Sequence, residues 1–359
     1  MDLEAILPRY SNIKKLTVTK FPYQYIFNYI PRLCPNLESF TFHRNKDGCH
    51  QDHRFPVTLP IRPTLPMFQG KLHTLILMED DFATPMPWDM MKNILEQASP
   101  TLQQLHCCFY FTNTRFTSIL GADPPRFNLP ELKILKCTVG EGKSQKYVAS
   151  LICNAPKLAA VTIRNYARTQ RIADQILDAL IGLDHLTWLE LLESRFSKQL
   201  NEKKLISLFD KHAALGDKAP LQCVSLDGPF VKRDILAPLT KVVTLRGIDL
   251  GFCNPNLNKF IVAVKKLKHF HDLRVMKMGT VTNDTLLKFA SIPNLKRFIL
   301  LACKNVNSNG LFKLVDNSLS LEELQISEGT NRSSKFEVHA KEKLAKFCIY
   351  SNFDDDNFV

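Results

Sequence analysis

The strongest constraint on this chain is a short apolar motif that recurs along its length. An apolar residue is followed by two variable residues, a second apolar residue, one variable residue and a third apolar residue. Clear copies begin at Leu37, Leu72, Leu132, Leu158, Leu186, Leu273, Leu295 and Leu321, and weaker copies at Ile13, Leu102, Leu221, Leu245 and Leu344. These 13 copies lie 22 to 35 residues apart. Among 50 leucines one copy would mean little, but thirteen in near-register indicate a repeat architecture.

The spacing inside the motif predicts how each repeat folds. The second and third apolar positions are two residues apart, so on a β-strand both side chains point to the same side. The remainder of each repeat is helical in pattern, as in the segment 171–182. One strand and one helix cannot bury a core alone, whereas stacked repeats can. We predict an α/β leucine-rich-repeat solenoid of about 13 repeats, a horseshoe with parallel strands on the concave face and helices on the convex face.

Two longer intervals interrupt the array predicted over residues 1–359. The first contains a Pro-rich insertion at 45–70, where proline favours an extended loop over a helix. The second is an insertion at 197–220 with a basic helical pattern. Insertions in solenoids often modulate binding, although a structural spacer is an equally good interpretation. Residues 351–359 are predicted to form an acidic C-terminal tail.

Composition narrows the class of protein. Apolar residues make up 45% of the chain and charged residues 23%, which is typical of a folded domain. No apolar run approaches the roughly 18–20 residues that a membrane helix needs, so no membrane partner is predicted. The start Met1-Asp2-Leu3-Glu4 lacks the basic and apolar regions of a signal peptide. A cytoplasmic or nuclear location is therefore expected.

The cysteines follow the repeat. Two of them fill the third apolar slot of a repeat, two come directly after a strand, and two end a helix. We predict that these six are small, buried, reduced core residues and form no disulfides: Cys107, Cys137, Cys253, Cys303, Cys34 and Cys153.

The repeat at 295–314 resembles a known family. Cys303 follows its strand, Val306 comes next, and Gly310-Leu311 enters the helix. Cys253 repeats the offset, and Cys34-Pro-Asn-Leu37 is similar to the helix exit of the same family. This pattern resembles the cysteine-containing leucine-rich repeats of F-box/LRR proteins. The resemblance implies a substrate-recognition component of an SCF-type ubiquitin ligase, in protein ubiquitination (the Ubl conjugation pathway).

One element of that family is not recognisable. Its F-box is a helical module that precedes the repeats and docks on a ligase scaffold subunit, but here the first repeat already begins at Ile13. A scaffold subunit is therefore an expected partner only if an F-box exists upstream.

The variable strand positions predict a binding face. They lie on the concave side and include large apolar residues and arginine, which often anchor protein interfaces. A register slip of one residue would instead put them in the core. The predicted protein-binding residues are Ile76, Met78, Arg164, Trp188, Leu192, Lys277, Arg297, Ile299 and Leu301.

Charge on the same face is nearly balanced, which disfavours nucleic acid as its partner. The basic positions are Lys15, Lys136, Arg164, Lys277, Arg297 and Lys346, and the acidic ones are Glu190, Asp227, Asp249 and Glu323. Most of the formal net charge of +12 must therefore lie on helices and loops.

The sequence offers little chemistry for catalysis. His43, Cys49, His50 and His53 match no zinc-ligand spacing, and no phosphate-binding or nucleophile motif occurs. No metal, cofactor or catalytic residue is predicted. The chain is expected to be a monomeric, non-catalytic recognition module with a protein client on its concave face.

Two alternatives remain open. The chain could be a nucleic-acid- or phosphate-binding protein that uses a basic outer surface, for example Lys265, Lys266 and Lys268. It could also be a plain interaction scaffold.

Overall fold

The computed structural model describes residues 12–19, 30, 34–44, 71–79, 94–109, 127–140, 143–165, 171–193, 200–229, 231, 235–253, 255–327 and 330–350. It divides into two compact units, Met1–Leu186 and Thr187–Val359. The predicted insertion at 45–70 and tail at 351–359 lie outside the described residues. The stretch predicted as the second insertion, 197–220, contains helix α6 (Glu202–Ala214) and a short 3₁₀ turn, Gly216–Lys218.

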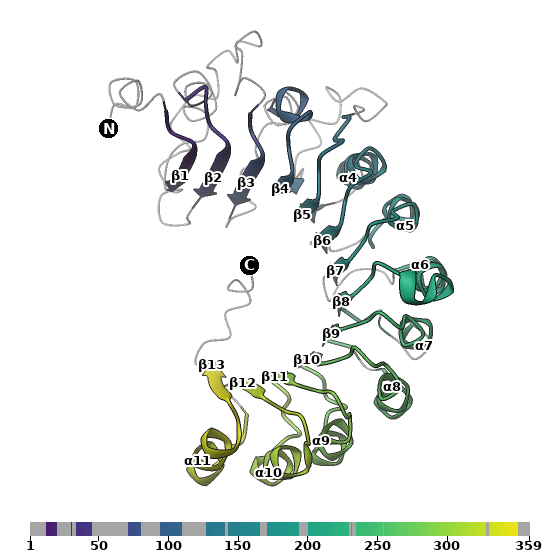
Figure 1. Ribbon diagram of the computed structural model, residues 1–359, viewed down its shortest axis with the longest axis vertical. Helices are drawn as coiled ribbons and strands as arrows, with labels where there is room; N and C mark the ends of the chain where they lie inside the picture. Colours follow the sequence, from purple (N-terminus) through teal and green to yellow (C-terminus); the bar gives the residue numbers. More distant parts are fainter. Residues whose placement is uncertain are drawn as a thin grey trace. The chain divides into compact units, whose positions relative to one another are not determined.

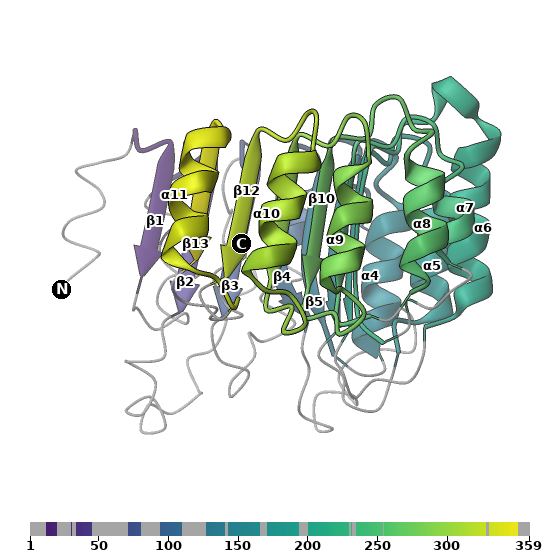
Figure 2. The ribbon, with the colours of Figure 1, turned by 90° about the horizontal axis from the view of Figure 1, so that it is seen from below.

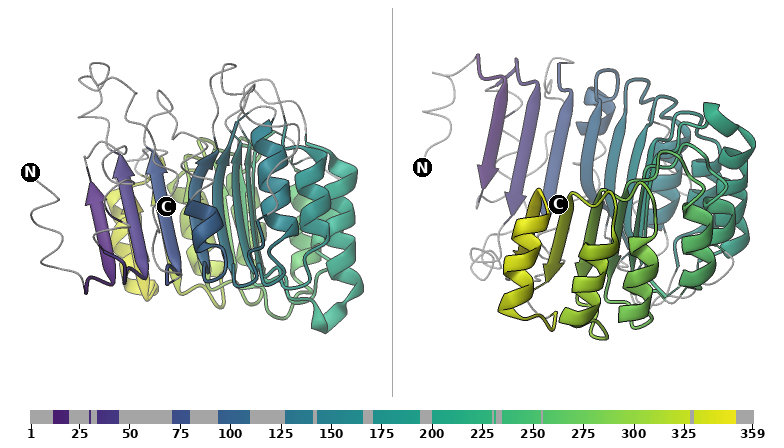
Figure 3. Two further views of the ribbon diagram at one scale, coloured as in Figure 1. Left: turned by 90° about the horizontal axis from the view of Figure 1, so that it is seen from above. Right: turned by 60° about the horizontal axis from the view of Figure 1, so that its bottom comes forward.

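The first unit contains a parallel sheet whose strands follow one another in sequence order (Figure 3). The strands are β1 (Lys15–Thr19), β2 (Ser39–Arg44), β3 (Thr74–Glu79), β4 (Gln104–Phe109), β5 (Ile134–Val139) and β6 (Ala160–Asn165). Its described helical segments are α4 (Lys143–Cys153), α5 (Asp174–Ile181) and residues 94–98. The register aligns the buried residues Leu105, Leu135 and Val161 across β4, β5 and β6.

The second unit continues the pattern with a larger set of helices (Figures 1 and 2). Its parallel strands are β7 (Trp188–Glu193), β8 (Cys223–Asp227), β9 (Gly247–Gly251), β10 (Asp272–Met276), β11 (Arg297–Leu301), β12 (Glu323–Ser327) and β13 (Lys346–Tyr350). Besides α6, its helices are α7 (Leu236–Leu239), α8 (Leu257–Val264), α9 (Asn283–Ala290), α10 (Ser308–Asn317) and α11 (Ser334–Lys343).

The core of the second unit lies between the sheet and the helices. Phe298 and Leu324 are opposite one another on β11 and β12, and both are fully buried. The ring of Phe289 on α9 packs against Phe298, with 5.4 Å between the ring centroids. Burying a large apolar side chain stabilises a fold by about 1.5–3 kcal/mol, so each repeat depends on its neighbours to cover these residues. The predicted α/β leucine-rich-repeat solenoid is confirmed.

One turn recurs in three successive repeats. Phe252, Lys277 and Ala302 have φ values of 49°, 51° and 52°, and each comes directly after a strand. The backbone N–H of Phe252 donates to the carbonyl oxygen of Met276 (3.0 Å), and that of Lys277 donates to Leu301 (2.8 Å). Ala302 donates to the hydroxyl of Ser327 at 2.8 Å. The left-handed residue therefore ties the end of each strand to the next repeat.

The structure corrects the predicted register of one repeat. Leu273 lies opposite Phe298, so it fills the second apolar position of its repeat rather than the first. The buried Phe270 takes the first position, and Val275 is buried as the third. The sequence pattern failed here because Met276 and Met278 satisfy the same apolar spacing three residues later.

The cysteine prediction is confirmed with one exception. Cys34, Cys107, Cys137, Cys253 and Cys303 are buried free thiols. Burial raises the pKa of Cys303 to about 11, which keeps it a neutral core residue. Cys153 is exposed, contrary to the prediction, because it ends α4 beside a surface cavity.

The recurrent turn can be tested by making the same substitution at two positions. Ala302→Gly removes a side chain from a left-handed residue and should raise the free energy of unfolding by up to about 1 kcal/mol. Ala263→Gly, in α8, should lower it by about 0.5–1 kcal/mol because glycine disfavours the helix. Urea denaturation measures both. Loss of stability in both variants would contradict the assigned turn.

Candidate functional site

The candidate site is the side of each sheet that lies opposite the helices, which we call the open face. It is formed by the first, third and fifth residues of each strand, since the second and fourth enter the core. In the second unit, no helix within the described residues lies on this side (Figure 1). Side chains here are therefore not required for core packing and are available for contacts with other molecules.

Several predicted binding residues lie on the open face. In the second unit, Trp188 is the first residue of β7, and 42% of its surface is exposed. Leu192 lies on the same face near the end of that strand and is half-buried. Arg297 begins β11 with its side chain 43% exposed. In the first unit, Ile76 on β3 and Arg164 on β6 are half-buried.

For the other four predicted binding residues, the structure describes no side chain that is exposed on the open face of a strand. Ile299 is only 7% exposed, between Arg274 and Gln325 of the neighbouring strands, and Leu301 is fully buried at the strand end. Lys277 lies beyond β10, and its ammonium is 4.6 Å from the centroid of the Phe252 ring. The side chain of Met78 is outside the described residues.

A ladder of alternating charges crosses β10 to β13 on the open face. Arg297 contacts Asp272 on one side (Nη1–Oδ2, 3.2 Å) and Glu323 on the other (Nε–Oε2, 3.6 Å). The Lys346 ammonium is 2.8 Å from Oε1 of Glu323. Exposed ion pairs contribute at most about 1 kcal/mol each, so the ladder is mainly important because it neutralises this part of the face.

The open face of β7 to β10 is acidic instead. It carries four carboxylates, Glu190, Asp227, Asp249 and Asp272, and one guanidinium, that of Arg274. Nη1 of Arg274 lies 4.0 Å from Oδ2 of Asp249. We call the four carboxylates the acidic patch.

Burial and charge make Asp249 an unusual carboxyl group. Its pKa is raised to about 7, first by burial and then by the negative charges of Asp272 and Glu190, while Arg274 opposes the rise. Asp249 therefore changes its ionisation near neutral pH.

The open face of the first unit has the opposite character. Its described strand side chains include Lys15, Lys136 and Arg164, and no carboxylate occurs among them. Burial and the charge of Lys136 lower the pKa of His106 to about 4, so that its ring is neutral at physiological pH. The near balance predicted for the concave strand positions taken together therefore combines one basic face with one partly acidic face.

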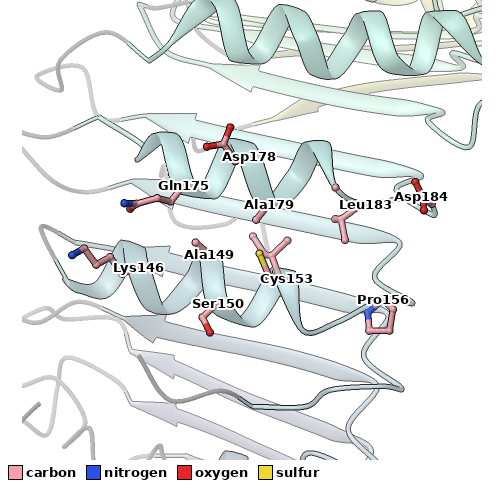
Figure 4. Close-up of a pocket in the computed structure, with 12 residues that line it drawn as sticks. Lys146, Ala149, Ser150, Cys153, Pro156, Gln175, Asp178, Ala179, Leu183 and Asp184 are labelled. Atoms are coloured by element: carbon pink, nitrogen blue, oxygen red, sulfur yellow. The ribbon is translucent and has the colours of Figure 1, made fainter. Parts of the chain in front are cut away.

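A surface cavity of about 720 Å³ lies on the helix side of the first unit, between α4 and α5 (Figure 4). Ala149 and Cys153 on α4 and Ala179 and Leu183 from the α5 side form part of its apolar lining. Among its lining residues, no histidine accompanies Cys153, so the cavity lacks the usual base for a cysteine nucleophile.

In the described part of the chain, no group of three or more histidine, cysteine, aspartate or glutamate residues is placed to hold a metal ion. No described helix has the length and apolar character needed to span a bilayer.

Comparisons with known proteins give structural matches only. No protein-family model matches the sequence, and no curated protein does. An internalin (inlF) from Listeria monocytogenes is 14% identical over 96% of this chain and 89% of its own, with a TM-score of 0.46. The yeast Rad7–Elc1 complex includes a chain that is 14% identical over 60% of this chain and 69% of its own, with a TM-score of 0.34. The fold assignment rests on the strands and helices described above.

The raised pKa of Asp249 predicts that the wild type and a variant without this carboxyl group differ in stability by an amount that depends on pH. The folded state holds this proton up to about pH 7, whereas an unfolded aspartate loses it near pH 4. Ionised Asp249 therefore destabilises the fold increasingly between these two values and by a constant amount above pH 7. We expect Asp249→Asn to be more stable than the wild type by about 1–2 kcal/mol at pH 8, a figure reduced for partial exposure, and the advantage to vanish towards pH 4.

Thermal and urea melts between pH 4 and 8 measure this difference. The control is Asp210→Asn, the same change at an exposed position on α6. An Asp249→Asn advantage that did not depend on pH would contradict the assigned environment.

Proposed function

We propose that this chain is a non-catalytic recognition module whose open face binds a protein client. The observation that carries the proposal is Trp188, a large aromatic residue 42% exposed on a strand where the core does not require it. Leu192 lies on the same face of β7, and Arg297 stands on β11. Tryptophan and arginine are the residues that most often dominate binding energy in protein interfaces.

A more specific role follows from the repeat type. Cys253 and Cys303 are buried at the same place after β9 and β11, as in the cysteine-containing repeats of F-box/LRR proteins. This supports a role as the substrate-recognition component of an SCF-type ubiquitin ligase in the cytoplasm or nucleus. Binding to a ligase scaffold subunit is part of the proposal only if an F-box precedes the chain.

The open face can be tested by photocrosslinking. A benzoylphenylalanine residue placed at Lys346 or Tyr350 on the open face, where it leaves Trp188 in place, should crosslink to a client protein when the chain is expressed in its own cells. The same residue at Val262 or Val338, which are 60% and 58% exposed on α8 and α11, is the matched control. Crosslinks from the helix positions alone would contradict the proposal.

A nucleic-acid- or phosphate-binding role is the alternative, and it has one supporting observation. Lys265, Lys266 and Lys268 are all exposed just after α8. If they form a binding surface, heparin or RNA binding should fall steeply with salt, and reversing the three charges should abolish it. Electrophoretic mobility shifts at low and moderate salt measure this, and binding that survives the reversal would exclude these lysines as its site.

A further inference from the structure

We propose that the client binds the acidic patch through a basic segment. One lysine or arginine side chain of this segment lies against Asp249, and a second pairs with Glu190 while its aliphatic stem rests on Trp188. This inference depends on the proposed recognition by the open face and adds the chemistry of the partner. The occupant to which we commit is an unfolded or extended protein segment with closely spaced positive charges.

Negative charge is in excess on the open face of the second unit. On β7 to β10 the open face carries four carboxylates and the guanidinium of Arg274. Arg297 of β11 adds a second positive charge beside Asp272, but it is shared with Glu323. The pKa of Asp249 is raised chiefly by burial; Arg274 opposes the rise, and the negative charges of Asp272 and Glu190 add to it. A cation delivered by a partner would relieve this repulsion.

The backbone of β9 leaves space around Asp249. Its open face reads Gly247, Asp249, Gly251, so Asp249 is the only side chain that the strand presents there. A Cβ atom at Gly251 would lie 2.8 Å from Cγ of Asp227, closer than the atoms can approach. Glycine at this position therefore leaves room for the Asp227 carboxylate, and for Cε of Met276, over the end of β9. At Gly247, a Cβ atom would be 3.4 Å from the Cβ of Asp272 on the other neighbouring strand.

Trp188 adds an aromatic surface to the acidic patch. It shares the open face of β7 with Glu190, two residues further along the strand. An exposed indole beside a carboxylate can hold the apolar stem of a lysine or stack with a guanidinium, while the carboxylate pairs with the charge. An acidic or purely apolar partner would use only one of these two features.

A metal ion is a poorer occupant than a basic side chain. Within the described residues, the carboxylates of the acidic patch do not come together in a group that could hold a metal ion. In addition, the formal net charge of the whole chain is +12, so a polybasic peptide is repelled by most of the surface. Binding of such a peptide would therefore report a local acidic site rather than general attraction.

The test measures binding of two fluorescent peptides, nona-arginine and nona-glutamate, to the full chain by anisotropy at pH 8. We expect nona-arginine to bind and the double variant Glu190→Gln/Asp249→Asn to bind it roughly tenfold or more weakly. Trp188→Ala should also weaken binding, whereas the control Asp210→Asn should not. Affinity for the wild type should fall from pH 8 to pH 6 as Asp249 takes up its proton. Melting curves confirm that each variant is folded.

Three results would overturn the inference. The first is that nona-arginine does not bind the wild type. The second is that the double variant and the Asp210→Asn control bind nona-arginine equally well. The third is that the wild type prefers nona-glutamate and that Lys136→Gln removes this preference. The last result would assign an acidic segment to the open face of the first unit instead. None of these affects crosslinking of a client from the open face, so failure of this inference is distinguishable from failure of the proposed function.

Discussion

The two-sidedness of a parallel β-strand is the constraint on which the rest of the structure depends. In each repeat, the second and fourth strand residues must be apolar because they enter the core. Leu273, Phe298 and Leu324 form one such buried row across β10, β11 and β12. No repeat can cover its own row, so burial in one repeat requires the next. This requirement leaves the alternate residues free of any core function, and they are the ones available for recognition.

Backbone conformation decides what the alternate residues can do. The left-handed turn after β9, β10 and β11 fixes where each strand leaves the sheet. On β9, glycine at position 251 brings the carboxylate of Asp227 close to the strand that carries Asp249. The negative charge of the site therefore depends on the missing side chain at position 251 as well as on the carboxylates. This charge lies on β7 to β10, next to a ladder of ion pairs that is nearly neutral.

Much of the fold could be predicted from the sequence, because the apolar period reports the core directly. Trp188 and Arg297 could also be assigned to the open face, since both stand in clear copies of the motif. The register at Leu273 could not be, because Met276 and Met278 imitate the apolar positions. Because of this error in register, Lys277 was included among the predicted open-face residues, and Asp272 and Arg274 were left out. Ile299 and Leu301 are buried by neighbouring repeats, and the apolar pattern of a single repeat carries no information about such contacts. Counting the charges of all concave positions together likewise hid the separation of the basic and acidic faces. The sequence Gly247-Ile-Asp249-Leu-Gly251 does show a strand whose only side chain on that face is a carboxylate.

The most direct test of this account compares two adjacent residues of β7. Leu189 is fully buried, whereas Trp188 next to it is 42% exposed on the open face. Urea denaturation should show that Leu189→Ala lowers the free energy of unfolding by about 2–5 kcal/mol and that Trp188→Ala, despite removing the larger side chain, lowers it by less than about 1.5 kcal/mol. Equal losses, or a larger loss for Trp188→Ala, would contradict the division of each strand into a core side and a recognition side.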